Sequence, residues 1–184
     1  MRCTANPLLG GLELRGARFP WEATAHGFEG SSSVFSHWAK YEIHISADIA
    51  FAHVSYFRAT GDKAWLRANY PLLKEVAIYH QSRVTKGPLP PTAGGSATEG
   101  SGAAAEYHVL HAMGPDEYNF DVVDPAFTMA VMQITLRGAA EAAAIAGDTT
   151  APTAAWLDIA DNLAVPEFNA SLGATPEYRG YPPA

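Results

Sequence analysis

The segment from Tyr41 to Ala59 constrains the fold of this chain more than any other, because its apolar residues recur with the period of a helix. Its apolar residues form two seams, one of Ile43, Ala47, Ala50, Val54 and Phe57 and another of Ile45, Ile49, Ala52 and Tyr56. A helix with two apolar seams packs against neighbours on more than one side. The segment therefore predicts a helix wrapped by others, in which the polar residues Glu42, His44 and Asp48 need partners.

Helix stop and start signals follow directly. Gly61 is predicted to end the first helix, and Asp62 to cap a second over residues 63–70. Proline suits the first position of a helix, so Pro71 is predicted to begin a third helix that runs to about Val84.

The second half of the chain shows the same pattern. Asp124 is predicted to cap a helix that Pro125 begins and that reaches Ala146. Gly138 and the alanines on its apolar face permit another helix to approach closely. A further helix is predicted over residues 152–163, and this recurrence of paired helices predicts an all-α fold. The apolar seam expected on the 125–146 helix is Phe127, Val131, Ile134, Gly138, Ala142 and Ile145.

Composition limits the class of protein. The chain has 184 residues, of which 48% are apolar and 17% charged, so it can bury a core and is expected to form one domain over residues 1–184. Its net charge of −7 argues against nucleic acid as a partner. No run of residues is apolar enough to cross a membrane, and the start of the chain is too polar for a signal peptide. No histidine spacing indicates a metal site, and nothing indicates a cofactor.

Residues 87–105 are rich in glycine, proline, serine and alanine and cannot build a core. They are predicted to form a flexible, low-complexity insertion at the surface.

The stretch Gly114-Pro-Asp-Glu-Tyr118 contains two adjacent carboxylates after a rigid turn. Aromatic residues such as Tyr118 and Phe120 beside Glu117 would leave its carboxylate poorly solvated, which raises the pKa and suits a general acid. The alternative is an ordinary polar loop in which Asp116 is a turn residue.

A second stretch, Gly16-Ala-Arg-Phe-Pro-Trp-Glu22, brings an aromatic ring, a cation and a carboxylate together. Sugar sites use flat aromatic rings against C–H faces and carboxylates to accept hydrogen bonds from hydroxyls, which suits Trp21 and Glu22. The alternative is that Phe19 and Trp21 are core anchors.

These two stretches, the helix at residues 41–62 and the continuation Asp124-Pro-Ala-Phe-Thr128 resemble glycoside hydrolase family 65 in the same order. The family contains acid trehalases, glucosylgalactosyl-hydroxylysine glucosidases and disaccharide phosphorylases. Its catalytic domain is an (α/α)6 barrel, of which this chain would supply about five of twelve helices, as a partial catalytic domain.

The resemblance implies that Glu117 is the general acid of an inverting hydrolysis of an α-linked glucoside, with Trp21, Glu22 and Tyr118 lining the pocket for a small carbohydrate. The catalytic base is expected outside this chain. Two alternatives stay open: an inverting disaccharide phosphorylase, and a helical fragment without activity. Val123, Pro125 and Met129 depart from the family pattern of asparagines beside the acid motif.

Overall fold

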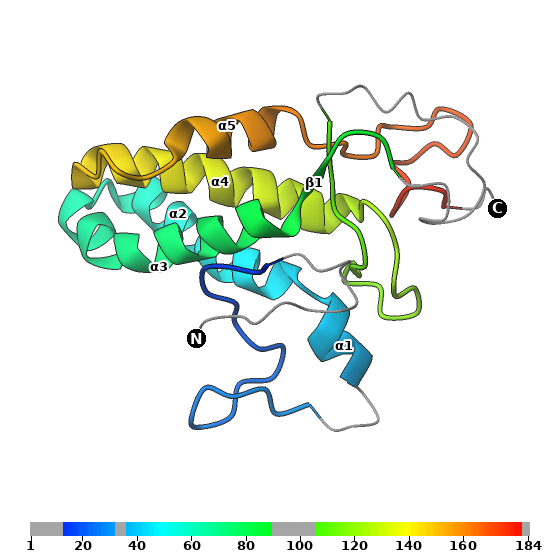
Figure 1. Ribbon diagram of the computed structural model, residues 1–184, viewed down its shortest axis with the longest axis horizontal. Coiled ribbons are helices and arrows are strands. Elements are labelled where there is room, and N and C mark those ends of the chain that lie inside the picture. The colour runs from blue at the N-terminus through cyan, green and yellow to red at the C-terminus, as the bar shows by residue number, and fades with distance from the viewer. Residues whose placement is uncertain (1–12, 32–35, 90–105, 182–184) are drawn as a thin grey trace.

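The computed structural model describes residues 13–31, 36–89 and 106–181 (Figure 1). These residues form five helices and one small sheet: α1 (Ser36–Tyr41), α2 (His44–Thr60), α3 (Lys63–Arg83), β1 (Thr85–Lys86), β2 (Tyr107–His108), α4 (Ala126–Ala146) and α5 (Thr153–Asp161). The strands β1 and β2 pair antiparallel, with Thr85 opposite His108. The chain is mostly helical, as predicted, but the all-α prediction did not include this sheet. No helix among the described residues is long and apolar enough to cross a membrane.

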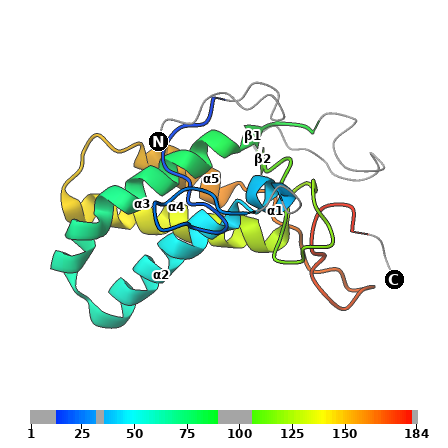
Figure 2. The same cartoon turned by 90° about the horizontal axis from the view of Figure 1, so that it is seen from below.

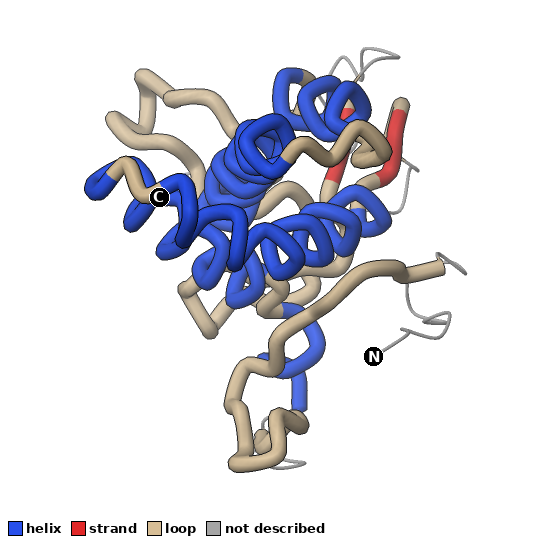
Figure 3. The backbone as a smooth tube through the Cα atoms, turned by 90° about the vertical axis from the view of Figure 1, so that its left-hand side faces the viewer, coloured by secondary structure: helices blue, strands red, loops and turns tan. Residues whose placement is uncertain are grey.

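Helix α4 is the centre of the helical layer. It packs against α2, α3 and α5, and α3 also contacts α2 and α5. In Figure 1 α5 lies above α4, with α2 and α3 below it, and Figure 3 shows the same helices from their end. The loops that connect to the ends of these helices carry the candidate functional residues.

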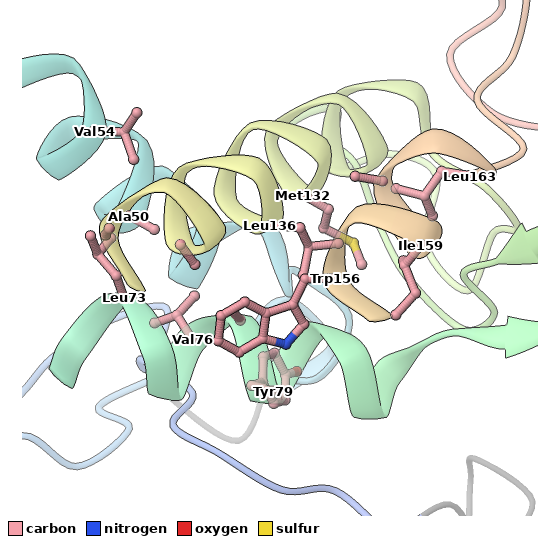
Figure 4. Close-up of a cluster of buried hydrophobic side chains, with 14 of the residues drawn as sticks. Ala50, Val54, Leu73, Val76, Tyr79, Met132, Leu136, Trp156, Ile159 and Leu163 are labelled. Carbon is pink, nitrogen blue, oxygen red and sulfur yellow. The ribbon is translucent and has the colours of Figure 1, made fainter. Parts of the chain in front are cut away.

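The core between α3, α4 and α5 is built around Trp156. Its ring is fully buried beside Val76, Tyr79 and Leu136 (Figure 4), and its Nε1 donates to the Gln81 Oε1 at 3.0 Å. A buried indole usually finds such a partner because an unpaired N–H is costly. The predicted inward residues of this last helix are all buried: Trp156, Ile159, Ala160 and Leu163.

Helix α2 confirms one of its two predicted seams. Every residue of the first seam is buried, from Ile43 to Phe57. In the second, Ile45 and Ile49 are half-buried and Ala52 and Tyr56 are exposed. The prediction of a fully wrapped helix is wrong for the described residues, in which α3 and α4 cover α2. The predicted start at Tyr41 is also wrong, because a separate helix, α1, ends there.

Helix α3 begins as predicted but does not break at proline. Gly61 ends α2 with a φ of 68°, and the Asp62 carboxylate accepts from the Trp65 N–H at 2.9 Å. Pro71 lies inside the continuous helix, on its exposed side. An interior proline costs about 3 kcal/mol. Tyr70 and Leu73 are buried on either side of it, so tertiary burial offsets that cost and the predicted break is wrong.

Helix α4 corrects two further predictions. Its N-cap residue is Pro125, with no side-chain capping hydrogen bond, so Asp124 is not the cap. Of the expected seam, Val131, Gly138 and Ala142 are buried, whereas Phe127 is 42% exposed. The buried face is wider than a single seam because α4 has neighbours on several sides. The insertion predicted at residues 87–105 lies outside the described residues from position 90 onward.

Candidate functional site

Three loops and one short helix lie around the helical layer: two of them lie below it in Figure 1, and two lie beyond its right-hand end in Figures 1 and 2. They are the aromatic loop (residues 16–31), α1, the acid turn (residues 112–122) and the C-terminal segment (residues 174–181). The acid turn lies just before α4, and the C-terminal segment is joined by backbone hydrogen bonds to Val123, which follows the turn, and to Ala126, the first residue of α4. Both stretches with candidate functional residues are therefore placed on loops held by a rigid helical scaffold.

The aromatic loop is anchored on α3 and α2 through its backbone. Gly16 has a φ of +78°, and a Cβ there would lie 2.2 Å from the Glu75 carbonyl oxygen, so only glycine fits. Next to it, the Ala17 N–H donates to that same oxygen at 3.0 Å. The Phe19 N–H donates to the Ser46 Oγ of α2 at 2.9 Å. These contacts fix the direction in which the loop leaves the helices.

Glu29 holds the far part of the aromatic loop closed. Its carboxylate accepts from the Trp21 N–H at 2.8 Å, from the Glu22 N–H at 3.2 Å and from Ser31 Oγ at 2.6 Å. Burial raises the pKa of Glu29, but these hydrogen bonds outweigh it and hold the pKa below its ordinary value. Glu29 thus has a structural role in the aromatic loop.

Trp21 and Glu22 are adjacent in sequence but have different surroundings in the structure. The Trp21 ring stacks on Trp38 of α1, with centroids 5.7 Å apart and an interplanar angle of 22°. Glu22 is exposed. Trp21 thus faces the short helix that sequence reasoning did not predict.

The acid turn is closed by a bridge between Ala112 and Val122, whose backbones exchange hydrogen bonds of 3.1 and 2.9 Å. Inside it, the Asp116 carboxylate accepts from the Tyr118 N–H at 3.1 Å and from the Asn119 Nδ2 at 2.8 Å. Asp116 is therefore the turn-forming residue. Its neighbour Glu117 is exposed.

The aromatic residues beside Glu117 do not desolvate it. Tyr118 is 93% exposed and Phe120 is 52% exposed. The expectation of a poorly solvated carboxylate between aromatic rings is therefore wrong for this chain. Phe120 instead stacks on Tyr41, at 6.1 Å between centroids, and so joins the acid turn to α1.

Helix α1 therefore connects the two candidate loops. Its residues Trp38 and Tyr41 are three positions apart, so they lie on one face of the helix. Trp38 contacts Trp21 of the aromatic loop, and Tyr41 contacts Phe120 of the acid turn.

Glu42, between α1 and α2, lies among the candidate residues and is 3% exposed. Burial raises the pKa of its carboxyl. The charge of His44 and a hydrogen bond with Trp21 lower it, and the charge of Glu117 raises it further. Glu42 thus interacts with Trp21 of the aromatic loop and with the like charge of Glu117 in the acid turn.

The polar residues at the start of α2 are partners of one another. His44 Nδ1 lies 2.8 Å from the Asp48 Oδ2, and its Nε2 lies 3.9 Å from the Glu42 Oε2. The His44 ring also meets the Phe127 ring edge to face at 5.2 Å. This confirms the prediction that His44 is a buried histidine with a polar partner.

Glu177 is a residue of this site that sequence reasoning missed. Burial raises its pKa to about 7, helped by the charge of Asp116 and a side-chain hydrogen bond with it. Its Oε1 lies 3.3 Å from the point where a Cβ on Gly114 would be, so a side chain there would require the Glu177 carboxylate to shift by a few tenths of an ångström. Glu177 is about sixty residues from the acid turn in sequence, and no local pattern relates the two.

No group of three or more histidine, cysteine, aspartate or glutamate residues that could hold a metal ion occurs in the described part of the chain.

Comparisons with known proteins match almost the whole chain. Residues 10–182 match the model of the glycosyl hydrolase family 65 central catalytic domain. The chain is 33% identical over 172 residues to a protein-glucosylgalactosylhydroxylysine glucosidase of Gallus gallus, covering 92% of this chain and 22% of the relative. It is 30% identical over 167 residues to a kojibiose hydrolase of Flavobacterium johnsoniae, covering 90% and 22%. The chain thus spans about a fifth of the length of these curated relatives.

The fold is also similar to a solved structure, assigned as a kojibiose phosphorylase from the human microbiome. The TM-score is 0.69 at 17% identity, and the match covers 96% of this chain and 25% of that one.

Proposed function

The chain belongs to glycosyl hydrolase family 65, and on that premise we propose that it is part of an inverting α-glucosidase in which Glu117 is the general acid. The observation that supports the proposal is that the two adjacent carboxylates of the acid turn have different surroundings. Asp116 is occupied by hydrogen bonds within the turn, whereas the Glu117 side chain is exposed and available to a substrate. Trp38 and Tyr41 of α1 connect this turn to Trp21, because Tyr41 stacks on Phe120 of the turn and Trp38 stacks on Trp21.

In the proposed reaction, the Glu117 carboxyl donates its proton to the glycosidic oxygen as the bond from that oxygen to the glucosyl C1 breaks. Water attacks C1 from the opposite face and gives up a proton to a second carboxylate, roughly 6.5–9.5 Å from the first in inverting enzymes. The proposal assigns that base to a part of the full-length protein outside this chain. Trp21, Glu22 and Tyr118 would contact the sugar.

We further propose that the five helices are a portion of an (α/α)6 barrel. The solved structure supports this, because nearly all of this chain matches a quarter of it. In such an assembly the exposed aromatic residues of α2, Phe51 and Tyr56, would face other helices. The substrate proposed is an α-linked glucosyl disaccharide or glucoside, the class to which the names of the glucosidase and the kojibiose hydrolase point.

The test uses the full-length protein with kojibiose, trehalose and maltose, each with and without inorganic phosphate. Glu117→Gln keeps the size of the side chain but cannot donate a proton, and turnover of disaccharides is expected to fall by about 10²–10⁴-fold. An activated substrate, α-glucosyl fluoride, needs little protonation of its leaving group and should lose far less. Equal disaccharide turnover by Glu117→Gln and the unaltered protein would refute the role. Turnover only with phosphate would favour the phosphorylase alternative, and no turnover at all would favour a protein without activity.

A further inference from the structure

The base of the acid turn, which comprises residues 109–111 and 121–124, is held in place by a buried carboxylate. Asp124 is 0% exposed, and its side chain accepts from His108 Nδ1 at 2.7 Å, from the Val109 N–H at 2.8 Å and from the Arg179 Nε at 2.7 Å. Its own N–H donates to the Val109 carbonyl at 2.9 Å. Asp124 thereby joins the strand that enters the acid turn to the C-terminal segment.

A buried arginine side chain also holds this base, through hydrogen bonds to its backbone. Arg83, at the end of α3, is 2% exposed. Its Nη2 donates to the Leu110 carbonyl at 2.8 Å and to the His111 carbonyl at 2.9 Å. These are the two residues that directly precede the acid turn. Both hydrogen bonds come from the two N–H groups of the planar Nη2, so the guanidinium sets the orientation of the two carbonyls that it binds.

The backbone at this base adopts an unfavourable conformation. Three non-glycine residues of the described chain have positive φ angles, namely His111 at 50°, Asp121 at 61° and Asp124 at 51°. His111 and Asp121 pair with each other, Nδ1 to Oδ1, at 2.6 Å. Such conformations persist where surrounding contacts determine them, and they cluster at functional sites. Here the determining contacts are those of Asp124, Arg83 and the His111–Asp121 pair.

We propose that Asp124 and Arg83 are positioning residues that hold the base of the acid turn and thereby set the place of the Glu117 carboxyl relative to the scissile glycosidic oxygen. Neither residue touches the substrate. The inference rests on the proposed role of Glu117, and it gives Asp124 a function in place of the helix cap that the local sequence indicated. A displacement of about 1 Å in a reacting group can lower a rate by about 10²-fold, so a loosened base is sufficient to impair proton donation.

The test compares two substrates in the full-length protein. Asp124→Asn keeps the shape of the side chain and removes its charge, and Arg179→Gln removes a partly exposed partner of Asp124. Both variants are expected to lower kcat for kojibiose, by about 10²-fold for Asp124→Asn. Turnover of α-glucosyl fluoride should change little, because its leaving group needs little help from an acid. Arg83→Lys puts a tetrahedral ammonium on a shorter side chain in place of the planar Nη2, so it should hold the two carbonyls less rigidly and show the same difference between the two substrates.

Matched controls come from ion pairs remote from the acid turn. Asp148 binds Lys74 Nζ and Tyr70 Oη, each at 2.7 Å, beyond the opposite end of α4, and Arg137 binds the Asp161 Oδ1 at 2.8 Å. Asp148→Asn and Arg137→Gln should therefore keep kojibiose turnover, whatever they do to stability. If Asp124→Asn does not fold, Arg179→Gln decides the test.

The results separate the two proposals. Equal losses on kojibiose and α-glucosyl fluoride, or losses matched by the controls, would overturn the positioning role while leaving Glu117 as the acid. Full kojibiose turnover by Glu117→Gln would instead remove the premise, and the positioning proposal with it.

Discussion

The contact between α2 and α4 permits a sharp test of packing. A Cβ added to Gly138 would lie 2.4 Å from the Val54 Cγ2, closer than real Cβ atoms approach. Val54 is 2% exposed and lies in a helix, where a valine side chain has one strongly preferred rotamer. It cannot turn away from an added methyl group without cost, so Gly138→Ala should force the two helices apart.

The magnitude follows from two opposing effects. Alanine in place of glycine inside a helix gains about 1 kcal/mol. Overpacking a core costs about 1–3 kcal/mol, so Gly138→Ala should lower the free energy of unfolding by up to about 2 kcal/mol. Val54→Ala removes two methyl groups and should cost about 2 kcal/mol on its own. In the double variant the new methyl group occupies the vacated space, so the pair should be more stable than the sum predicts by about 1 kcal/mol or more.

Urea denaturation followed by far-UV circular dichroism would measure all four proteins. Ala130→Gly, on an exposed position of the same helix, measures the helix-propensity difference alone, about 1 kcal/mol. Additivity of Gly138→Ala and Val54→Ala within about 0.5 kcal/mol would show that the two side chains do not compete for one space. A stabilised Gly138→Ala protein would likewise refute the argument.

Two further predictions concern stability. The pKa of Glu177 is raised from 4.5 to about 7, mainly by burial and then by the charge of Asp116, so the folded state binds this proton more tightly than the unfolded state. Its contribution to stability is therefore complete below about pH 4.5 and is lost as the pH rises through 7. Glu177→Gln should flatten that part of the stability profile measured by denaturation at several pH values, and an unchanged slope would contradict the assignment. Asp62→Ala removes the N-cap of α3 and should cost about 1 kcal/mol, whereas Asp62→Asn should cost little; equal losses from both would argue against a capping role.

Local signals predicted those parts of the fold that local chemistry decides. Gly61 and Asp62 mark the junction of α2 and α3 because a left-handed residue and a capping carboxylate act within a few residues. The inward residues of α5 could be read from helical periodicity because one face of that helix meets the core. Pro71 could not be placed this way. Its local cost is real, but buried neighbours on the same helix outweigh it, and they exert their effect through tertiary packing.

In the candidate site, too, contacts between residues close in sequence could be predicted and contacts between distant residues could not. The sequence left the turn role of Asp116 open as an alternative, because the partners of such a turn residue, here Tyr118 and Asn119, lie within three positions of it. The roles of Asp124 and Glu177 could not be predicted, because their partners lie far away in sequence. Asp124 binds His108 and Arg179, which are 16 and 55 residues distant. A capping aspartate and a buried ion-pair aspartate look identical in a local pattern before a helix.

The strained backbone shows why this distinction matters for function. A non-glycine residue in the left-handed region costs about 1–3 kcal/mol, and the acid turn and its base contain three. Had Asp124 merely capped α4, nothing in the local sequence would offset its φ of 51°. Its carboxylate instead makes three hydrogen bonds in a fully buried position, where such bonds to a charged group contribute about 1.5–3 kcal/mol each. The shape of the acid turn is therefore imposed by α3, β2 and the C-terminal segment together. Altering any of these three should move the proposed general acid, even though none of them contains it.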